Sequence, residues 1–207
     1  MIPTVLLKLV FDNLTFYTKH TFRKINKKMN QFTIFDLHNI QSKYKKKMND
    51  EILSNYNPRF LDASDNQYIT NINHMTNLKL LNASFNTGLS DEGIQNLNLT
   101  KLYTMHNYRI TDVNHMSDLK ELYGYGYLCG MTDYGIKKLN LKILDASDNR
   151  NITDVNHMTN MEELYAAYDC GISDKGIKNL NLCILSSMNN GKIMNVAHMT
   201  NLKLHIK

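Results

Sequence analysis

A seven-residue segment recurs four times along the chain, at intervals of 41, 42 and 41 residues. Its copies, which read Ile-Thr-Asp-Val-Asn-His-Met or a close variant, lie at residues 69–75, 110–116, 152–158 and 193–199. A second segment containing Asp-x-Gly-Ile lies between them, at residues 89–94, 131–136 and 172–177. A repeat of this length cannot bury its own apolar face and must place it against its neighbours. The sequence therefore predicts a stacked solenoid, with two unlike coils of about twenty residues in each period.

Four coils carry the full pattern Leu-x-x-Leu-x-small-x-x-Asn, as in the coil with Leu78, Leu81, Ala83 and Asn86. The coils that end in Tyr127 and Asp169 depart from it, and the first coil carries only part of it. Leucine and the small residue lie two apart, so they face one side of a short strand and the residue between them faces the other side. An asparagine amide at the strand exit can bond backbone groups of adjacent turns. We expect such a row of asparagines at Asn66, Asn86, Asn107, Asn149 and Asn190, with a local irregularity at Tyr127.

Over residues 58–207 this pattern resembles the leucine-rich repeat family, with seven coils and a truncated stub. The high Asn, Lys, Ile and Tyr content is similar to leucine-rich repeat proteins of AT-rich genomes, such as those of large DNA viruses of amoebae. The resemblance implies an α/β fold: a leucine-rich repeat solenoid with a parallel β-sheet on its concave side and short helices or 3-10 turns on its convex side. The Ser-Asp-x-Gly-Ile form resembles repeats of F-box leucine-rich proteins. We expect Asp91, Asp133 and Asp174 to be helix N-caps there.

Residues 1–40 resemble an F-box, an α-helical segment that begins here with Ile2 and Pro3. The resemblance implies that an adaptor protein of a cullin-type ligase binds Pro3, Leu6, Leu7, Val10, Leu14, Phe22 and Ile25. Their spacing independently predicts helices with one apolar face, which needs a partner because the segment is too small for a sizeable core. The alternative is a helical cap that seals the first coil. We expect three parts: 1–40, a basic linker with a degenerate half-coil at 41–57, and the repeats at 58–207.

Charge is distributed unevenly along the chain, whose formal net charge is +5 at pH 7. Residues 1–57 hold 10 Lys and Arg against 4 Asp and Glu, and residues 58–207 hold 14 against 15. Phosphate contact needs a basic stripe, so nucleic acid is not the expected partner of the repeats. The basic cluster at residues 43–47 is interpreted either as a solvated helix face or as a nuclear import or nucleic-acid-binding segment.

Three cysteines, and no secretory leader or membrane span, predict an intracellular protein, cytoplasmic or nuclear, that does not enter a membrane. Equivalent positions two coils apart lie roughly 10 Å from each other. This separation disfavours a disulfide between Cys129 and Cys170, which we expect to be buried. It also disfavours a metal site, so we expect surface or capping roles for the recurring His74, His115, His157 and His198, and no metal or other cofactor.

No catalytic set or phosphate-binding loop is present, so the sequence predicts neither an enzyme nor a small-molecule substrate. The strand pattern instead predicts an outward-facing surface that binds an unknown target protein, flanked by Lys101, Glu121 and Glu163. Its predicted contacts are Asp62, Asn82, Tyr103, Tyr123, Tyr125, Asp145 and Tyr165. Tyrosine is enriched at protein interfaces, although it also fits strands well.

Two functional hypotheses follow. In the first, the chain resembles substrate-recognition subunits of cullin-type ubiquitin ligases, in which the F-box binds the adaptor and the concave face holds the target. In the second, it is a stand-alone scaffold or binding module, and its N-terminal helices only cap the array. The pattern also predicts an uncapped end at residues 201–207, with exposed strand edge and core.

Overall fold

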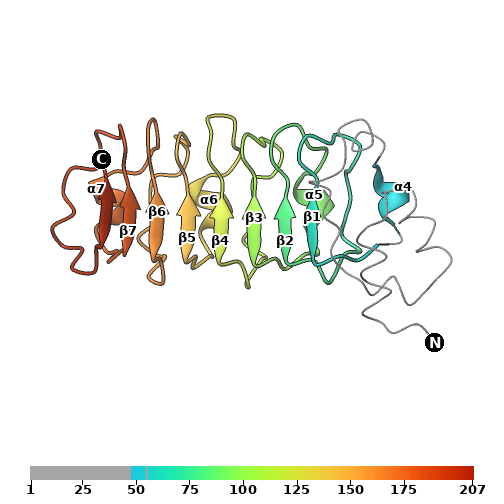
Figure 1. The fold of residues 1–207 in the computed structure, drawn as a ribbon, viewed down its shortest axis with the longest axis horizontal. Coiled ribbons are helices and arrows are strands. Elements are labelled where there is room, and N and C mark those ends of the chain that lie inside the picture. The colour runs from blue at the N-terminus through green and yellow to red at the C-terminus, as the bar shows by residue number, and fades with distance from the viewer. Residues whose placement is uncertain (1–47, 55) are drawn as a thin grey trace, which may run out of the picture.

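The computed structural model describes residues 48–54 and 56–207. These residues form one parallel sheet of eight strands, in which every strand pairs with its neighbours in chain order (Figure 1). The strands are β1 (Phe60–Asp62), β2 (Leu80–Asn82), β3 (Lys101–Tyr103), β4 (Glu121–Tyr123), β5 (Ile143–Asp145), β6 (Glu163–Tyr165), β7 (Ile184–Ser186) and β8 (Leu204–Ile206). The predicted repeat solenoid is confirmed. The F-box-like segment, the basic cluster and all seven predicted adaptor contacts lie outside the described residues.

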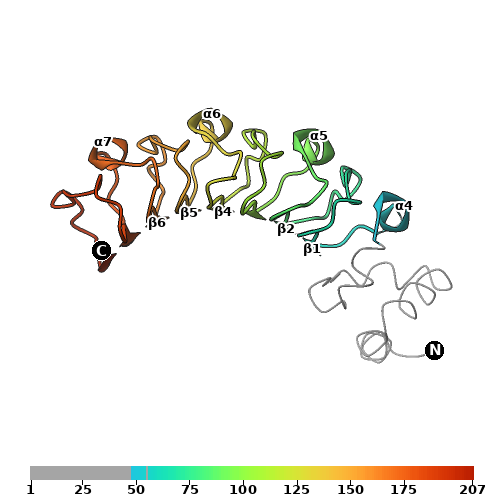
Figure 2. The same cartoon turned by 90° about the horizontal axis from the view of Figure 1, so that it is seen from above.

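Short helices occupy every second coil of the described array. They are α4 (Asp50–Leu53), α5 (Asp91–Ile94), α6 (Asp133–Ile136) and α7 (Asp174–Ile177). Figure 2 shows the array curved, with the strands on its concave side and the helices on its convex side. The predicted alternation of two unlike coils is therefore present, and α4 lies in the half-coil expected near residue 50.

The predicted N-caps are wrong by one residue. Ser90, Thr132 and Ser173 have the extended backbone of an N-cap, so each aspartate is the first helical residue instead. The Asp133 carboxylate bonds the next coil: it accepts from the backbone N–H of Thr153 at 2.7 Å and from the Thr153 hydroxyl at 2.5 Å. The aspartates therefore join neighbouring coils, and an isolated helix pattern does not reveal this.

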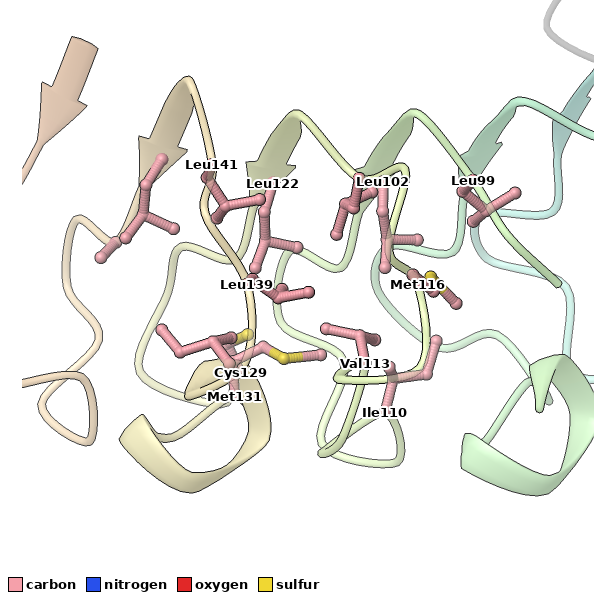
Figure 3. Packing of buried hydrophobic residues seen from close by; sticks show 14 of the residues in the cluster. Leu99, Leu102, Ile110, Val113, Met116, Leu122, Cys129, Met131, Leu139 and Leu141 are labelled. Atoms are coloured by element: carbon pink, nitrogen blue, oxygen red, sulfur yellow. The ribbon is translucent and has the colours of Figure 1, made fainter. Parts of the chain in front are cut away.

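The core is a continuous column inside the coils. The central leucines of β1 to β7 have no exposed surface: Leu61, Leu81, Leu102, Leu122, Leu144, Leu164 and Leu185. Figure 3 shows Leu102 and Leu122 pointing into the same interior as Val113, Cys129 and Met131 from the far side of the coils. The recurring Met75, Met116 and Met158 are also fully buried. Stacking thus covers apolar surface that one coil alone would leave in water.

The row of buried asparagines occurs only in every second coil. Asn107 Nδ2 donates to the Ala83 carbonyl at 2.8 Å, and its Oδ1 accepts from the Arg109 N–H at 2.8 Å. Asn149 and Asn190 donate to the equivalent carbonyls of Gly124 and Ala166. Asn66 donates to the Met48 carbonyl. Asn86 is exposed, so its predicted place in the row is wrong.

The other coils replace the amide with a close backbone approach. Thr87, Cys129 and Cys170 are buried at the corresponding turn, and each is followed by glycine. The Gly88 N–H donates directly to the Asn66 carbonyl at 3.0 Å. A Cβ atom at Gly88 would lie 2.4 Å from a backbone oxygen, which explains why only glycine fits this approach. The expected irregularity is present at Tyr127, which follows Gly126 at φ +103° and is 72% exposed.

The recurring histidines cap the helices. His74, His115, His157 and His198 each place Nε2 3.0 to 3.3 Å from the carbonyl of the last residue of α4, α5, α6 and α7 in turn. The predicted capping role is confirmed, and it satisfies a carbonyl that a helix end leaves without an internal partner. Within residues 48–54 and 56–207, no group of three or more His, Cys, Asp or Glu could hold a metal ion. The cysteines in this part are free, and none of its helices is long and apolar enough to cross a membrane.

The last strand differs from the predicted uncapped core. His205 occupies the inward position that holds leucine in β1 to β7, and its Nε2 lies 2.9 Å from the Ser187 hydroxyl. A polar side chain therefore replaces leucine in the inward row at β8, whereas Leu204 and Ile206 on either side of it are 48% and 37% exposed. The expected exposed apolar surface is present, but it belongs to the outward face of β8.

We expect the pairing of β8 with β7 to become less stable in acid. Burial, and secondly the charge of Lys207, lower the pKa of His205 below its ordinary value of about 6.5. The unfolded strand therefore binds a proton more readily, so the contribution of His205 is full above about pH 6.5 and is lost as pH falls through the lower, folded-state pKa. Hydrogen-exchange protection of residues 203–206, corrected for intrinsic rates, should decrease in the wild type as the pH is lowered. In His205→Leu it should not change with pH. Equal losses in both proteins would contradict this role.

Candidate partner-binding surface

The concave surface is formed by the outward residues of the strands. In β3, the burial pattern places Leu102 inward and leaves Lys101 and Tyr103 partly exposed. Strand register aligns the equivalent residues into rows across the sheet. The row of third residues runs Asn82, Tyr103, Tyr123, Asp145 and Tyr165, and the row of first residues runs Lys101, Glu121, Ile143 and Glu163. We call these residues, with Tyr125, the tyrosine face.

Two tyrosines stack at the centre of the tyrosine face. The rings of Tyr103 and Tyr123 lie 4.5 Å apart between centroids, with an interplanar angle of 16°. Lys101 Nζ lies 5.2 and 4.8 Å from the two ring centroids and 2.6 Å from Glu121 Oε2. The Tyr123 hydroxyl donates to the same carboxylate oxygen at 3.1 Å. Cation–π, ionic and stacking contacts therefore fix these four side chains relative to one another.

The electrostatics of this cluster keep Lys101 charged. Burial opposes the ammonium form, but hydrogen bonding to Glu121 and Tyr103 outweighs it and raises the pKa of Lys101 above its ordinary value. Burial also raises the pKa of Tyr123, so its phenol remains protonated at neutral pH. The ammonium of Lys101 and the carboxylate of Glu121 consequently balance each other within the protein.

A second tyrosine and carboxylate pair lies two strands further along. The Tyr165 hydroxyl donates to Glu163 Oε2 at 3.0 Å. Asp145 is the register neighbour of Tyr165, and its Oδ1 accepts from the Ser147 N–H at 3.0 Å. Burial raises the pKa of Asp145 above its ordinary value, although the bonds from Ser147 oppose the shift. Burial raises the pKa of Tyr125 as well, with a further contribution from the charge of Asp145.

Two predicted contacts are engaged in turns. Asp62 is only 2% exposed, and its carboxylate accepts from the N–H and hydroxyl of Ser64, so it does not present that carboxylate at the surface. Asn82 remains partly exposed, while its Oδ1 accepts from the Ser84 N–H at 3.2 Å. A polar residue at this strand position therefore closes a local turn, as Asp145 also does, and the simple alternation rule does not distinguish the two roles.

The structure adds an aromatic edge that the strand pattern missed. The His106 ring contacts three other rings, with centroid distances of 6.0 Å to Phe85, 5.3 Å to Tyr127 and 6.3 Å to Tyr125. The tyrosine face thus continues through Tyr125 onto the loops that follow the strands. Phe85 and His106 both lie four residues beyond the strand leucine and have positive φ. The recurrence of that position along the repeat is the signal that could have found them.

Comparisons with protein families and curated proteins do not assign a family to this chain. A scan against models of protein families finds no match to this chain, and a search of curated proteins finds no significant match. A functional interpretation therefore depends on the geometry of the tyrosine face and on the sequence patterns of residues 1–40.

Proposed function

We propose that the chain is a protein–protein interaction protein whose concave tyrosine face holds a target protein. The observation that supports this most directly is the stacked Tyr103–Tyr123 pair, which stays partly exposed although it is fixed by Lys101 and Glu121. Tyrosine offers a large contact area with a polar end and is enriched at interfaces. This combination suits the binding of a folded or extended protein surface.

The bonds between tyrosines and carboxylates support the same proposal. The hydroxyls of Tyr123 and Tyr165 are each tied to a glutamate on their own strand. Side chains that are already ordered lose less rotational freedom on binding, so more of the contact energy appears as affinity. A rigid sheet with pre-ordered aromatic side chains is therefore a favourable platform for a partner.

Removal of two tyrosines from the tyrosine face should strongly weaken binding of the target protein. We expect the double variant Tyr123→Ala and Tyr165→Ala to bind a captured partner at least about tenfold more weakly, because buried aromatic anchors at interfaces each contribute on the order of 1 to 2 kcal/mol. Tyr134→Ala provides the matched control, since Tyr134 lies in α6 on the convex side and is 66% exposed. Equal affinity of the double variant and this control, measured by titration calorimetry with both proteins folded, would contradict the proposal.

For the cellular role, we propose a substrate-recognition subunit of a cullin-type ubiquitin ligase. The support is the F-box resemblance of residues 1–40, which lie outside the described part of the chain. In such a complex the protein contributes proximity, because it raises the effective concentration of its target near the transfer machinery. A stand-alone leucine-rich repeat scaffold, in which the N-terminal helices only cap the array, is the alternative.

Co-purification separates these two roles. The full chain should retain the adaptor protein, and the double variant Pro3→Ala and Leu6→Ala should lose it while it keeps the circular dichroism spectrum of the wild type. A wild-type chain that retains no adaptor would overturn the ligase role and favour the scaffold. Neither result bears on the tyrosine face, so the two parts of the proposal fail separately.

A further inference from the structure

Two units of the tyrosine face occupy equivalent places, 42 residues apart in the repeat. The first unit comprises Lys101, Tyr103, Glu121 and Tyr123 on β3 and β4, and the second comprises Ile143, Asp145, Glu163 and Tyr165 on β5 and β6. Both have the same parallel register, with the first and third residues of each strand facing outward. The chain therefore contains two versions of one site, which can be compared directly.

The tyrosine and glutamate are unchanged between the units. Tyr123 donates to Glu121 at 3.1 Å, and Tyr165 donates to Glu163 at 3.0 Å, in both cases to the Oε2 atom. In the first unit the same carboxylate also binds the ammonium of Lys101, which lies over the tyrosine rings. The first unit is thus an example, within this protein, of a cation held by a tyrosine and its glutamate.

The second unit has lost this cation and gained an acid. Ile143 replaces the lysine, and Asp145 replaces the stacked tyrosine. The formal charge of the four residues therefore changes from zero, with one Lys and one Glu, to −2, with one Asp and one Glu. In the described part of the chain, no Lys, Arg or His nitrogen forms an ion pair within 4 Å of either carboxylate, and Lys142 and Arg150 pair with Glu162 and Asp169 instead.

We propose that the second unit is a subsite for a basic side chain of the target protein, a lysine or an arginine that takes the place Lys101 has in the first unit. The inference depends on the proposed function of the tyrosine face. The incoming ammonium or guanidinium would lie against the Tyr165 ring and contact the carboxylates of Asp145 and Glu163. Such a cation combines a charge-assisted hydrogen bond with a cation–π contact, and arginine can also bridge two carboxylate oxygens.

Because the two units have equivalent positions, the first unit suggests a selective way to block this subsite. Ile143→Lys places a lysine one strand before Glu163, as Lys101 is one strand before Glu121. The introduced ammonium should occupy the subsite from within the protein and exclude the partner's cation. Ile143→Leu is the matched control, because it changes the same outward position without adding charge.

The test uses peptides selected by the full chain from a random twelve-residue display library. We expect the selected sequences to share a lysine or arginine at one position, and replacement of that residue by glutamine to weaken binding at least tenfold in fluorescence anisotropy. Ile143→Lys should cause a similar loss, and Ile143→Leu should change affinity less than twofold. Glu163→Gln should also weaken the basic peptide but not its glutamine version.

Two results would overturn the proposal, and they are distinguishable. Peptides that bind less well to the Tyr123→Ala and Tyr165→Ala protein, but equally well to Ile143→Lys and the wild type, would sink the cation subsite and leave the tyrosine face as a binding surface. Peptides that bind equally well to all these variants would contradict the proposed function together with the subsite.

Discussion

Gly135→Ala should destabilise the solenoid by about 3 kcal/mol, toward the upper end of the range for overpacked positions. Gly135 lies in α6, and a Cβ atom built there would be 1.8 Å from the Thr111 carbonyl oxygen of the preceding coil. The Val113 N–H also donates to the Gly135 carbonyl at 3.0 Å, so the two backbones cannot separate without losing a hydrogen bond. The urea midpoint of unfolding, compared with the wild type, measures the effect.

Gly191→Ala is the matched control for this substitution. Gly191 is exposed, its backbone is outside the left-handed region, and a Cβ atom there would meet nothing within 4 Å. We expect its free energy of unfolding to stay within about 0.5 kcal/mol of the wild type. If the two variants unfolded at the same urea concentration, the close approach of α6 to the preceding coil would be refuted.

Asn149→Ala should also destabilise the protein by about 3 kcal/mol, because a buried polar group left without a partner costs on the order of 1 to 3 kcal/mol. Asn149 is 1% exposed. Its Nδ2 donates to the carbonyls of Gly124 and Met131 at 3.2 and 3.1 Å, and its Oδ1 accepts from the Asn151 N–H at 2.9 Å. Alanine removes all three bonds and leaves the carbonyls of Gly124 and Met131 and the N–H of Asn151 without this partner.

Asn86 makes this prediction specific to one type of coil. The sequence pattern gives Asn86 and Asn149 the same position, five residues beyond the strand leucine, yet Asn86 is exposed. Asn86→Ala should therefore change the free energy of unfolding by less than about 0.5 kcal/mol. Similar losses for both alanine variants in thermal and urea unfolding would mean that the asparagine row is continuous, contrary to the structure.

These two residues also show how far the sequence predicts the fold. The period, the inward leucines and the alternation of coils follow from spacing alone, because each is a local property that repetition reinforces. The distinction between Asn86 and Asn149 depends on whether a coil contacts the preceding coil directly through a glycine backbone, as Gly88 does, or through an asparagine amide, as Asn149 does. This choice arises between coils, so a column alignment of single coils does not display it.

The aspartates of the helices illustrate the same limit. Asp133 matches the residue preference of an N-cap, and the prediction located the start of α6 within one residue. Its carboxylate is nevertheless used by Thr153 of the next coil. Local helix chemistry therefore predicts the element correctly and its stabilising contact incorrectly, since the partner lies 20 residues away along the chain.

The candidate surface was predictable where it depends on strand alternation. Tyr103, Tyr123 and Tyr165 face outward as expected, because each flanks an inward leucine by one residue. Asp62 was predicted on the same rule, but it is buried and bonded to Ser64. The Phe85 edge was missed because its exposure results from a left-handed backbone residue after the strand, which period-two patterning does not describe.

Hydroxyl-radical footprinting of the chain with its most abundant captured partner is the most direct test of the proposal that a target protein lies on the tyrosine face. We expect slower oxidation of Tyr103, Tyr123 and Tyr165 in the complex than in the free chain, and unchanged oxidation of Tyr134 on the convex side. Slower oxidation of Tyr134, with the three concave tyrosines as reactive as in the free chain, would contradict the proposal.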